Sequence, residues 1–348
     1  MTAGTLCAAV LTTGFSSCQP QTCVTCEEDG QPAVLTISLA SGITKSVSAQ
    51  TQEQDNTINT LDVFIFRDGD ASAADYQKLD TYKRFEGDAL ADLTLSTTTG
   101  AKLICVIANS NISTYAGITN LQAFRALTST LADETLADFT MYGEAKQTLG
   151  VTSSVSILLT RMISRVAVTS IKTKFDGTPY AGMTLSNCKL FLINVHGEKL
   201  IYNGNSLETP LILNNGSLVG EDVNSTEEAG LLMDNITEVI TGEAYSTAHY
   251  LYCYSNETDD ITSSTKLVLQ ADLDGITYYY PIPVNQAGYG YTGSNSHYGI
   301  RRNTAYSYSI TVTRPGSLDP DTPVVPGMLE LSIEIADWTV IPSFEKVF

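Results

Sequence analysis

Basic residues are scarce in this 348-residue chain, which has 19 Lys and Arg against 38 Asp and Glu and a net charge of −19. Such a surface repels the phosphates of nucleic acids and of anionic lipid head groups, so we expect no nucleic-acid partner. Histidine is scarcer still: His196, His249 and His297 are the only three, and they lack the spacing of metal ligands. The sequence therefore predicts no metal site and no cofactor.

Helical periodicity and long apolar runs are also rare. Beyond the N-terminal segment, no apolar run approaches the roughly 18 residues that would span a bilayer. One short helix is expected after Thr119 or Asn120 as cap, from the spacing of Leu121, Phe124, Leu127 and Leu131. Thr, Ser, Tyr, Val and Ile are plentiful, and this composition favours an all-β protein.

The sequence contains no convincing catalytic motif. There is no G-x-S-x-G, and no Cys has a compelling His partner. The stretch "GYGYTG" at Gly288–Gly293 matches G-x-G-x-x-G, but a loop follows it where a dinucleotide site needs a helix. "ADLDG", with Asp272 and Asp274, predicts a hairpin turn and not a calcium loop. We therefore expect a protein that is not an enzyme.

Two segments alternate clearly between apolar and polar residues, as half-buried strands do. "AVLTISLA" (Ala33–Ala40) places Leu35, Ile37 and Leu39 on one face. Near the other end of the chain, "LELSIEI" does the same; its apolar face consists of Leu329, Leu331, Ile333 and Ile335. A stretch rich in Pro and Asp, "RPGSLDPDTPVVPG", precedes this last strand, and we expect it to be a flexible break.

The first residues predict an export signal. Ser16, Ser17 and Cys18 follow a small, apolar stretch and resemble a bacterial lipobox, in which the Cys is acylated. The alternative is an unstructured N-terminus with an incidental Cys. Cys23 and Cys26 would lie on the same tether. Three further cysteines are expected to be small buried hydrophobic residues: Cys105, Cys188 and Cys253. Any disulfide pairing is left open.

The length of the chain exceeds one ordinary core, so two domains are expected. We place a signal and tether at 1–32, an N-terminal domain at 33–165 and a C-terminal domain at 166–348.

Several segments in order resemble the Bacteroidia fimbrillin family, the type V pilins. They cover nearly the whole chain: the Cys18 region, "AVLTISLASGITK", "INTLDVFIFRDGD", "AKLICVIAN", "LLTRMISRVAV", "RRNTAYSYSITVTRPGS" and "LELSIEIADW". Two features depart from the family pattern, since no Lys or Arg precedes Cys18 and Lys45 stands where the family usually has Arg.

The resemblance implies two transthyretin-like β-sandwiches and export as a lipoprotein acylated at Cys18. It also implies proteolytic removal of the first strand and polymerisation by strand exchange. Lys45 is the only basic residue between Cys18 and Arg67, so we expect cleavage between Lys45 and Ser46. The displaced strand would carry Leu35, Ile37 and Leu39. The donor strand would carry Leu329, Leu331, Ile333 and Ile335, with Trp338 as an anchor or a plain core residue.

The expected function is therefore a structural subunit of a surface fimbria that contributes to adhesion. Its partners would be further copies of itself, accessory or tip pilins, and the outer membrane through the lipid before processing. The alternative is a surface-anchored glycan-binding lipoprotein, which would keep its first strand and need an exposed aromatic platform. A secreted hydrolase is a weaker alternative, because convergent carboxylates or a nucleophile are not visible.

Overall fold

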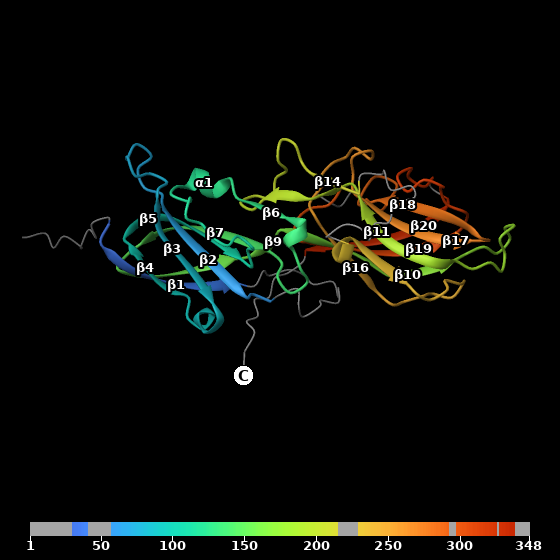
Figure 1. The fold of residues 1–348 in the computed structure, drawn as a ribbon, viewed down its shortest axis with the longest axis horizontal. Helices are drawn as coiled ribbons and strands as arrows, with labels where there is room; N and C mark the ends of the chain where they lie inside the picture. The colour runs from blue at the N-terminus through green and yellow to red at the C-terminus, as the bar shows by residue number, and fades with distance from the viewer. Residues whose placement is uncertain (1–29, 41–56, 215–228, 292–296, 326, 338–348) are drawn as a thin grey trace, which may run out of the picture.

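The computed structural model describes residues 30–40, 57–214, 229–291, 297–325 and 327–337. These residues are mostly β, with two short α-helices among them, and they form two halves that lie end to end along the long axis (Figure 1). This confirms the predicted fold class.

Two sheets form the N-terminal half. The smaller has the order β4 (Thr94–Thr98), β1 (Pro32–Ala40), β8 (Thr152–Leu158). The larger has the order β3 (Leu79–Glu86), β2 (Thr60–Arg67), β5 (Gly100–Ala108), β7 (Met141–Leu149), β9 (Thr160–Arg161). A short 3-10 turn, Gly87–Ala91, connects β3 to β4.

The central strands β2 and β5 of the five-stranded sheet are buried on both faces, which explains their continuous apolar runs, Val63–Phe66 and Leu103–Ala108. Val63 and Ile65 of β2 point into the core shared with β1, β4 and β8. Phe64 and Phe66 point the other way, and both rings pack on Phe124, at centroid distances of 4.9 and 5.3 Å. The N-terminal half is therefore a sandwich whose large sheet has a second covered face.

The predicted short helix is confirmed as α1 (Leu121–Arg125). Asn120 caps it, because its side-chain oxygen accepts from Ala123 N at 2.9 Å. The helix is shorter than its apolar spacing predicts. Leu127 lies beyond its end, and Leu131 falls in a separate 3-10 turn.

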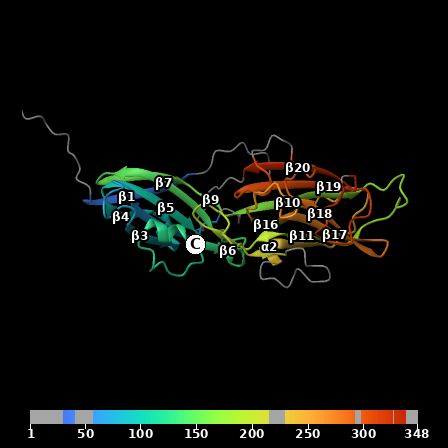
Figure 2. The ribbon, with the colours of Figure 1, turned by 90° about the horizontal axis from the view of Figure 1, so that it is seen from above.

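Two four-stranded sheets form the C-terminal half (Figure 2). One has the order β16 (His249–Tyr254), β10 (Ile163–Thr173), β19 (Thr304–Val312), β20 (Leu329–Asp337). The other has the order β15 (Met233–Ile236), β11 (Ser186–Ile193), β17 (Lys266–Leu273), β18 (Ile276–Pro283). The second helix, α2 (Ala229–Leu232), which the sequence did not predict, leads into β15.

The hairpin predicted from "ADLDG" joins β17 to β18. Asp274 and Gly275 both have positive φ, 52° and 76°, as a two-residue hairpin turn requires. Two smaller ribbons complete the fold: β12 (Val195–His196) with β14 (Ile212–Leu213), and β6 (Thr128–Thr130) with β13 (Glu198–Leu200).

The ribbon of β6 and β13 joins segments far apart in sequence, and a buried carboxylate lies beside it. Glu134 is 4% exposed and accepts hydrogen bonds from Ser129 Oγ (3.0 Å), Tyr254 Oη (2.9 Å) and Thr140 N (2.8 Å). Burial raises the pKa of this carboxyl above its usual range. These contacts link the two halves, and the division at 165/166 stays a prediction, since β10 spans it.

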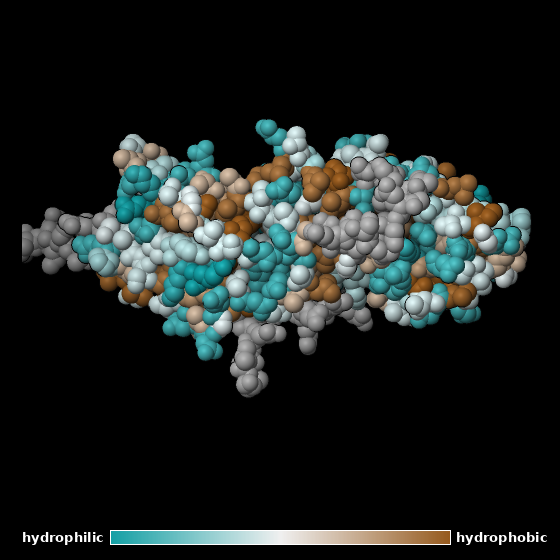
Figure 3. Space-filling model, viewed as in Figure 1, coloured by the Kyte–Doolittle hydropathy of each residue, from teal (hydrophilic) through white to brown (hydrophobic). Residues whose placement is uncertain are grey.

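Hydrophobic residues (brown) occur in separate groups between hydrophilic ones (teal) on the face seen in Figure 3. Among the described residues, no helix is long and apolar enough to cross a membrane.

Candidate functional site

Strand β1 is the central strand of its sheet, and it is held on both edges. It pairs antiparallel with β4 over five residues and parallel with β8 over seven. Ile37 N donates to Leu93 O (3.0 Å) on the β4 side, whereas Val34 N donates to Val151 O (2.9 Å) on the β8 side. Removing β1 would therefore leave two rows of unpaired backbone groups.

The predicted alternation of β1 is confirmed. Leu35 is fully buried, Ile37 is 4% exposed and Leu39 is half-buried, while Val34 on the opposite face is 44% exposed. Leu35 and Ile37 belong to the core between the two N-terminal sheets. Burying two such side chains contributes about 3–6 kcal/mol, so an empty β1 position would be an unfavourable apolar groove. The role of this strand as the displaced strand stays a prediction.

A cavity of about 250 Å³ lies at the amino end of β1. Gly30, Thr98 and Gly100 form part of its wall, together with the side chains of Arg67 and Lys102. Gln31 and Pro32, at this end of β1, are exposed.

Strand β20 is an edge strand. Within the described residues it pairs with β19 alone, antiparallel over nine residues, and Figure 2 shows it at the outer edge of its sheet. Its apolar face is less buried than that of β1: Leu329 is 8% exposed, and three others are half-buried, Leu331, Ile333 and Ile335. The predicted alternation is confirmed, and the donor role stays a prediction.

A loop covers part of β20. Gly290 lies so close that a Cβ on it would come 2.6 Å from Cγ2 of Ile333. Its φ of +118° also favours glycine. Gly290, the second glycine of "GYGYTG", therefore has a packing role.

The expected flexible break before β20 is wrong. The backbone of residues 314–325 is hydrogen-bonded to the edge of β18 at two points: Ser317 and Tyr279 exchange two bonds of 2.8 Å, and Val324 N donates to Pro281 O at 3.2 Å. Val324 is buried, and its carbonyl accepts from Tyr289 Oη at 2.8 Å. Proline and aspartate favour irregular backbone, and this segment is indeed irregular. Its backbone nevertheless finds hydrogen-bond partners on the edge of β18, which holds it in place.

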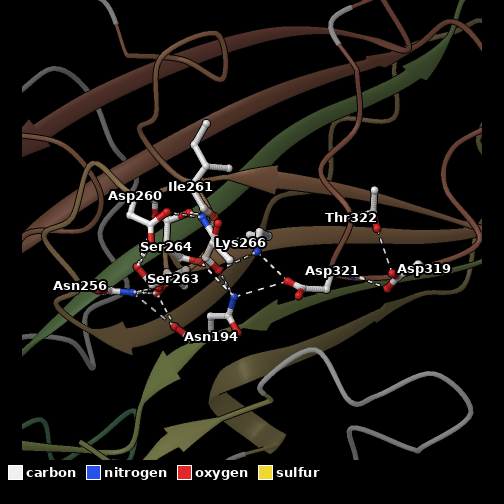
Figure 4. Close-up of polar contacts among 12 residues, drawn as sticks. Asn194, Asn256, Asp260, Ile261, Ser263, Ser264, Lys266, Asp319, Asp321 and Thr322 are labelled. Carbon is white, nitrogen blue, oxygen red and sulfur yellow. Dashed lines mark hydrogen bonds and ion pairs between the residues drawn. The ribbon is translucent and has the colours of Figure 1, made fainter.

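An ion pair holds the middle of the same segment. Lys266 Nζ lies 2.6 Å from Oδ1 of Asp321, and its side chain is 1% exposed. Asn194 points at the same carboxylate from β11's end (Nδ2 to Oδ1, 3.5 Å), as the close-up in Figure 4 shows. A buried ammonium needs such a partner, so Asp321 fixes the linker to the domain. We call residues 314–325, held in this way, the anchored linker.

The remaining predicted site residues lie outside the described residues. These are Cys18, Lys45, Ser46 and Trp338, so lipidation, processing and the anchoring role of the tryptophan stay predictions.

Three cysteines are confirmed as buried, and their thiols are free: Cys105, Cys188 and Cys253. Burial raises the pKa of each thiol to about 12. In the part of the chain that the structure describes, no group of three or more His, Cys, Asp or Glu is placed to hold a metal ion.

The family model described as "Major fimbrial subunit protein (FimA)" matches residues 33–214. A curated relative, the major fimbrium subunit FimA type-5 of Porphyromonas gingivalis, is 38% identical over 74 residues. That match spans 20% of this chain and 18% of the relative.

Solved structures show the same fold. A fimbrilin (FimA) from Porphyromonas gingivalis has a TM-score of 0.63 at 19% identity, covering 89% of this chain and 98% of that one. The tip fimbrial protein Mfa3 of the same organism, with a C-terminal truncation, has a TM-score of 0.50 at 13% identity, covering 88% and 100%. With the family model matching more than half of its length, this chain belongs to the FimA family of major fimbrial subunit proteins, which are structural and not enzymatic.

Proposed function

We propose that this chain is exported as a lipoprotein through Cys18, cleaved between Lys45 and Ser46, and polymerised into a surface fimbria by donor-strand exchange. In this scheme β1 leaves the N-terminal half of one copy, and β20 of another copy takes its place. The partners are further copies of the chain and accessory or tip pilins. The resulting fimbria contributes to adhesion.

The different positions of the two strands carry this proposal. β20 has one paired edge and a half-buried apolar face, whereas the β1 position offers two paired edges and nearly complete burial. A strand that moves from the first position to the second gains hydrogen bonds and buries more apolar surface. The free energy therefore favours exchange once β1 has gone.

Cleavage is the step that allows β1 to dissociate from the subunit. Lys45 follows the end of β1 at Ala40, so a cut there leaves β1 attached to the subunit by pairing and packing alone. Before the cut, the covalent connection keeps β1 at a high effective concentration near its own groove.

The glycan-binding alternative needs an exposed aromatic platform, which the buried tyrosines of the described residues do not supply. Many tyrosine rings are core residues and not an exposed platform; the fully buried ones include Tyr252, Tyr254, Tyr280, Tyr306 and Tyr308.

The test is electron microscopy of purified full-length protein before and after limited trypsin treatment. We expect monomers before treatment and filaments after it, because Lys45 is the only tryptic site between Cys18 and Arg67. Intact, folded subunits that remain monomeric after quantitative cleavage at Lys45 would contradict the proposal.

We expect Cys18→Ala to release the precursor from membranes. Each buried methylene of an acyl chain contributes about 0.8 kcal/mol to membrane binding, and this variant has no acyl chain. Membrane flotation followed by immunoblotting measures the change, with Cys23→Ala as the matched control that should still float. A Cys18→Ala precursor that floats like the wild type shows that Cys18 is not the anchor.

A further inference from the structure

We infer that the donor strand lies parallel to the β1 strand it replaces. Residues Leu329, Leu331, Ile333 and Ile335 then occupy the positions of Ala33, Leu35, Ile37 and Leu39. The inference rests on the proposed exchange and adds its direction and register. The apolar period alone decides neither, since an antiparallel strand would also turn its apolar face inward.

The two ends of β1 lie at different places in the molecule. Its amino end lies beside the short connections from β4 to β5 and from β7 to β8, since Pro32 is opposite Thr98 and Val34 is opposite Thr152. Its carboxyl end, Ala40, is opposite Leu158, from which β9 leads directly into β10 of the C-terminal half. The amino end is therefore at the free end of the N-terminal half, and the carboxyl end faces the middle (Figure 1).

Strand β20 has the opposite placement in the C-terminal half. Its last residue, Asp337, is opposite Thr304, close to the junction where Asn303 N donates to Ile163 O. Its first residue, Leu329, is opposite Val312, at the end of β10 that is remote from the N-terminal half. The connection to β20 therefore lies at the distal tip of the molecule.

The pivot for release lies at Gly327. The anchored linker is held up to Val324 by backbone bonds and by the pair of Lys266 and Asp321. Gly327 follows it with a φ of +106°, and a Cβ added there would meet no atom within 4 Å. Its carbonyl accepts from Thr313 Oγ1 at 2.7 Å, so release of β20 breaks this bond. Rotation there lets β20 project from the distal tip, with Leu329 nearest its own subunit.

An end-to-end filament sets the distal tip of one copy against the free N-terminal end of the next. The projecting strand then enters the vacant groove at the Pro32 end, with Asp337 leading. Leu329 stays near the entrance and Ile335 lies deepest, which is the direction of β1. Glu330, Ser332 and Glu334 replace Val34, Thr36 and Ser38, three positions that face solvent.

Cross-strand disulfides distinguish the directions. Val34 and Ser96 are opposite each other, and Val34 N bonds to the β8 side, so they form a non-hydrogen-bonded pair. The α-carbons of such pairs are about 4.5 Å apart, within the range of about 4.4–6.8 Å that a disulfide spans. In the parallel register, Glu330 of the donor takes the place of Val34 and faces Ser96.

The experiment compares three double variants in processed filaments on non-reducing gels. We expect Glu330→Cys with Ser96→Cys to give a ladder of linked subunits, and Glu334→Cys with Ser96→Cys to give none. Ser332→Cys with Thr94→Cys links in either direction, because Ser332 lies at the position of Thr36 in both. The native thiols do not interfere, since Cys105, Cys188 and Cys253 are buried.

The outcomes test the direction of the donor strand separately from the exchange itself. A ladder with Glu334→Cys and not with Glu330→Cys overturns the direction and keeps the exchange. Filaments that link in none of the three variants overturn the inferred register, and the exchange itself is tested separately by Ile333→Asp. Where a double variant does not assemble, a peptide spanning 327–338 with cysteine at 330 or 334, added to processed Ser96→Cys subunit, gives the same readout.

Discussion

Ile333→Asp is expected to abolish filaments and to leave a folded, processed subunit. In its own sheet, Ile333 is only half-buried, on an edge strand, so a carboxylate there is less completely desolvated than it would be in the groove. In the groove it would occupy the position of Ile37, which is 4% exposed. An unpaired carboxylate there costs several kcal/mol, in addition to about 1.5–3 kcal/mol of lost apolar burial. Electron microscopy and sedimentation of processed protein measure the loss.

Ser332→Asp is the matched control, since it adds the same charge to the opposite face of the same strand. Ser332 is exposed in β20, and Thr36, whose position it would take, is exposed in β1. This variant should assemble like the wild type. Normal filaments from a folded, processed Ile333→Asp protein would remove β20 from the role of donor.

Lys45→Gln is expected to block both maturation and assembly. With β1 still attached to the chain, its effective concentration at the groove is on the order of millimolar, far above that of a free subunit. Leu35 and Ile37 therefore stay in place and the donor is excluded. N-terminal sequencing of mature wild-type protein should begin at Ser46, whereas the variant should keep its full N-terminus and remain monomeric.

Lys172→Gln provides the comparison, because it removes an exposed lysine from β10 and should be processed and assembled normally. A mature wild-type protein that begins at another residue would exclude Lys45 from the mechanism.

Most of the strand pattern could be predicted because each sheet face leaves a local signal. Leu35 and Ile37 alternate with exposed residues, and the run Val63–Phe66 is apolar at every position because both of its faces are covered. The helix after Asn120 was predicted too long. Residues 128–130, beyond its end, pair instead with 198–200, so a distant strand prevailed over the local spacing.

The anchored linker could not be predicted from its composition. Pro and Asp specify irregular backbone but not its partner. Lys266 begins a strand whose next residues are apolar, and 55 positions separate it from Asp321. The periodicity of a helix or a strand relates only residues that are close in sequence, so it does not indicate a pair of charges this far apart. The same limit applies to the edge position of β20, since alternation does not show how many neighbours a strand has.

The placement of β1 along the long axis has a mechanical consequence for a filament built in the inferred way. Tension between two subunits would pull the donor strand along its own length, so the hydrogen bonds on its two edges would share the load in shear. A strand attached at a right angle would instead peel, breaking its bonds one at a time. The anchored linker leaves little slack before that shear-loaded strand, because Lys266 and Asp321 hold the chain close to the pivot. The joint between subunits would thus be short and stiff, and resistant to rupture under the drag that a surface fibre experiences in flow.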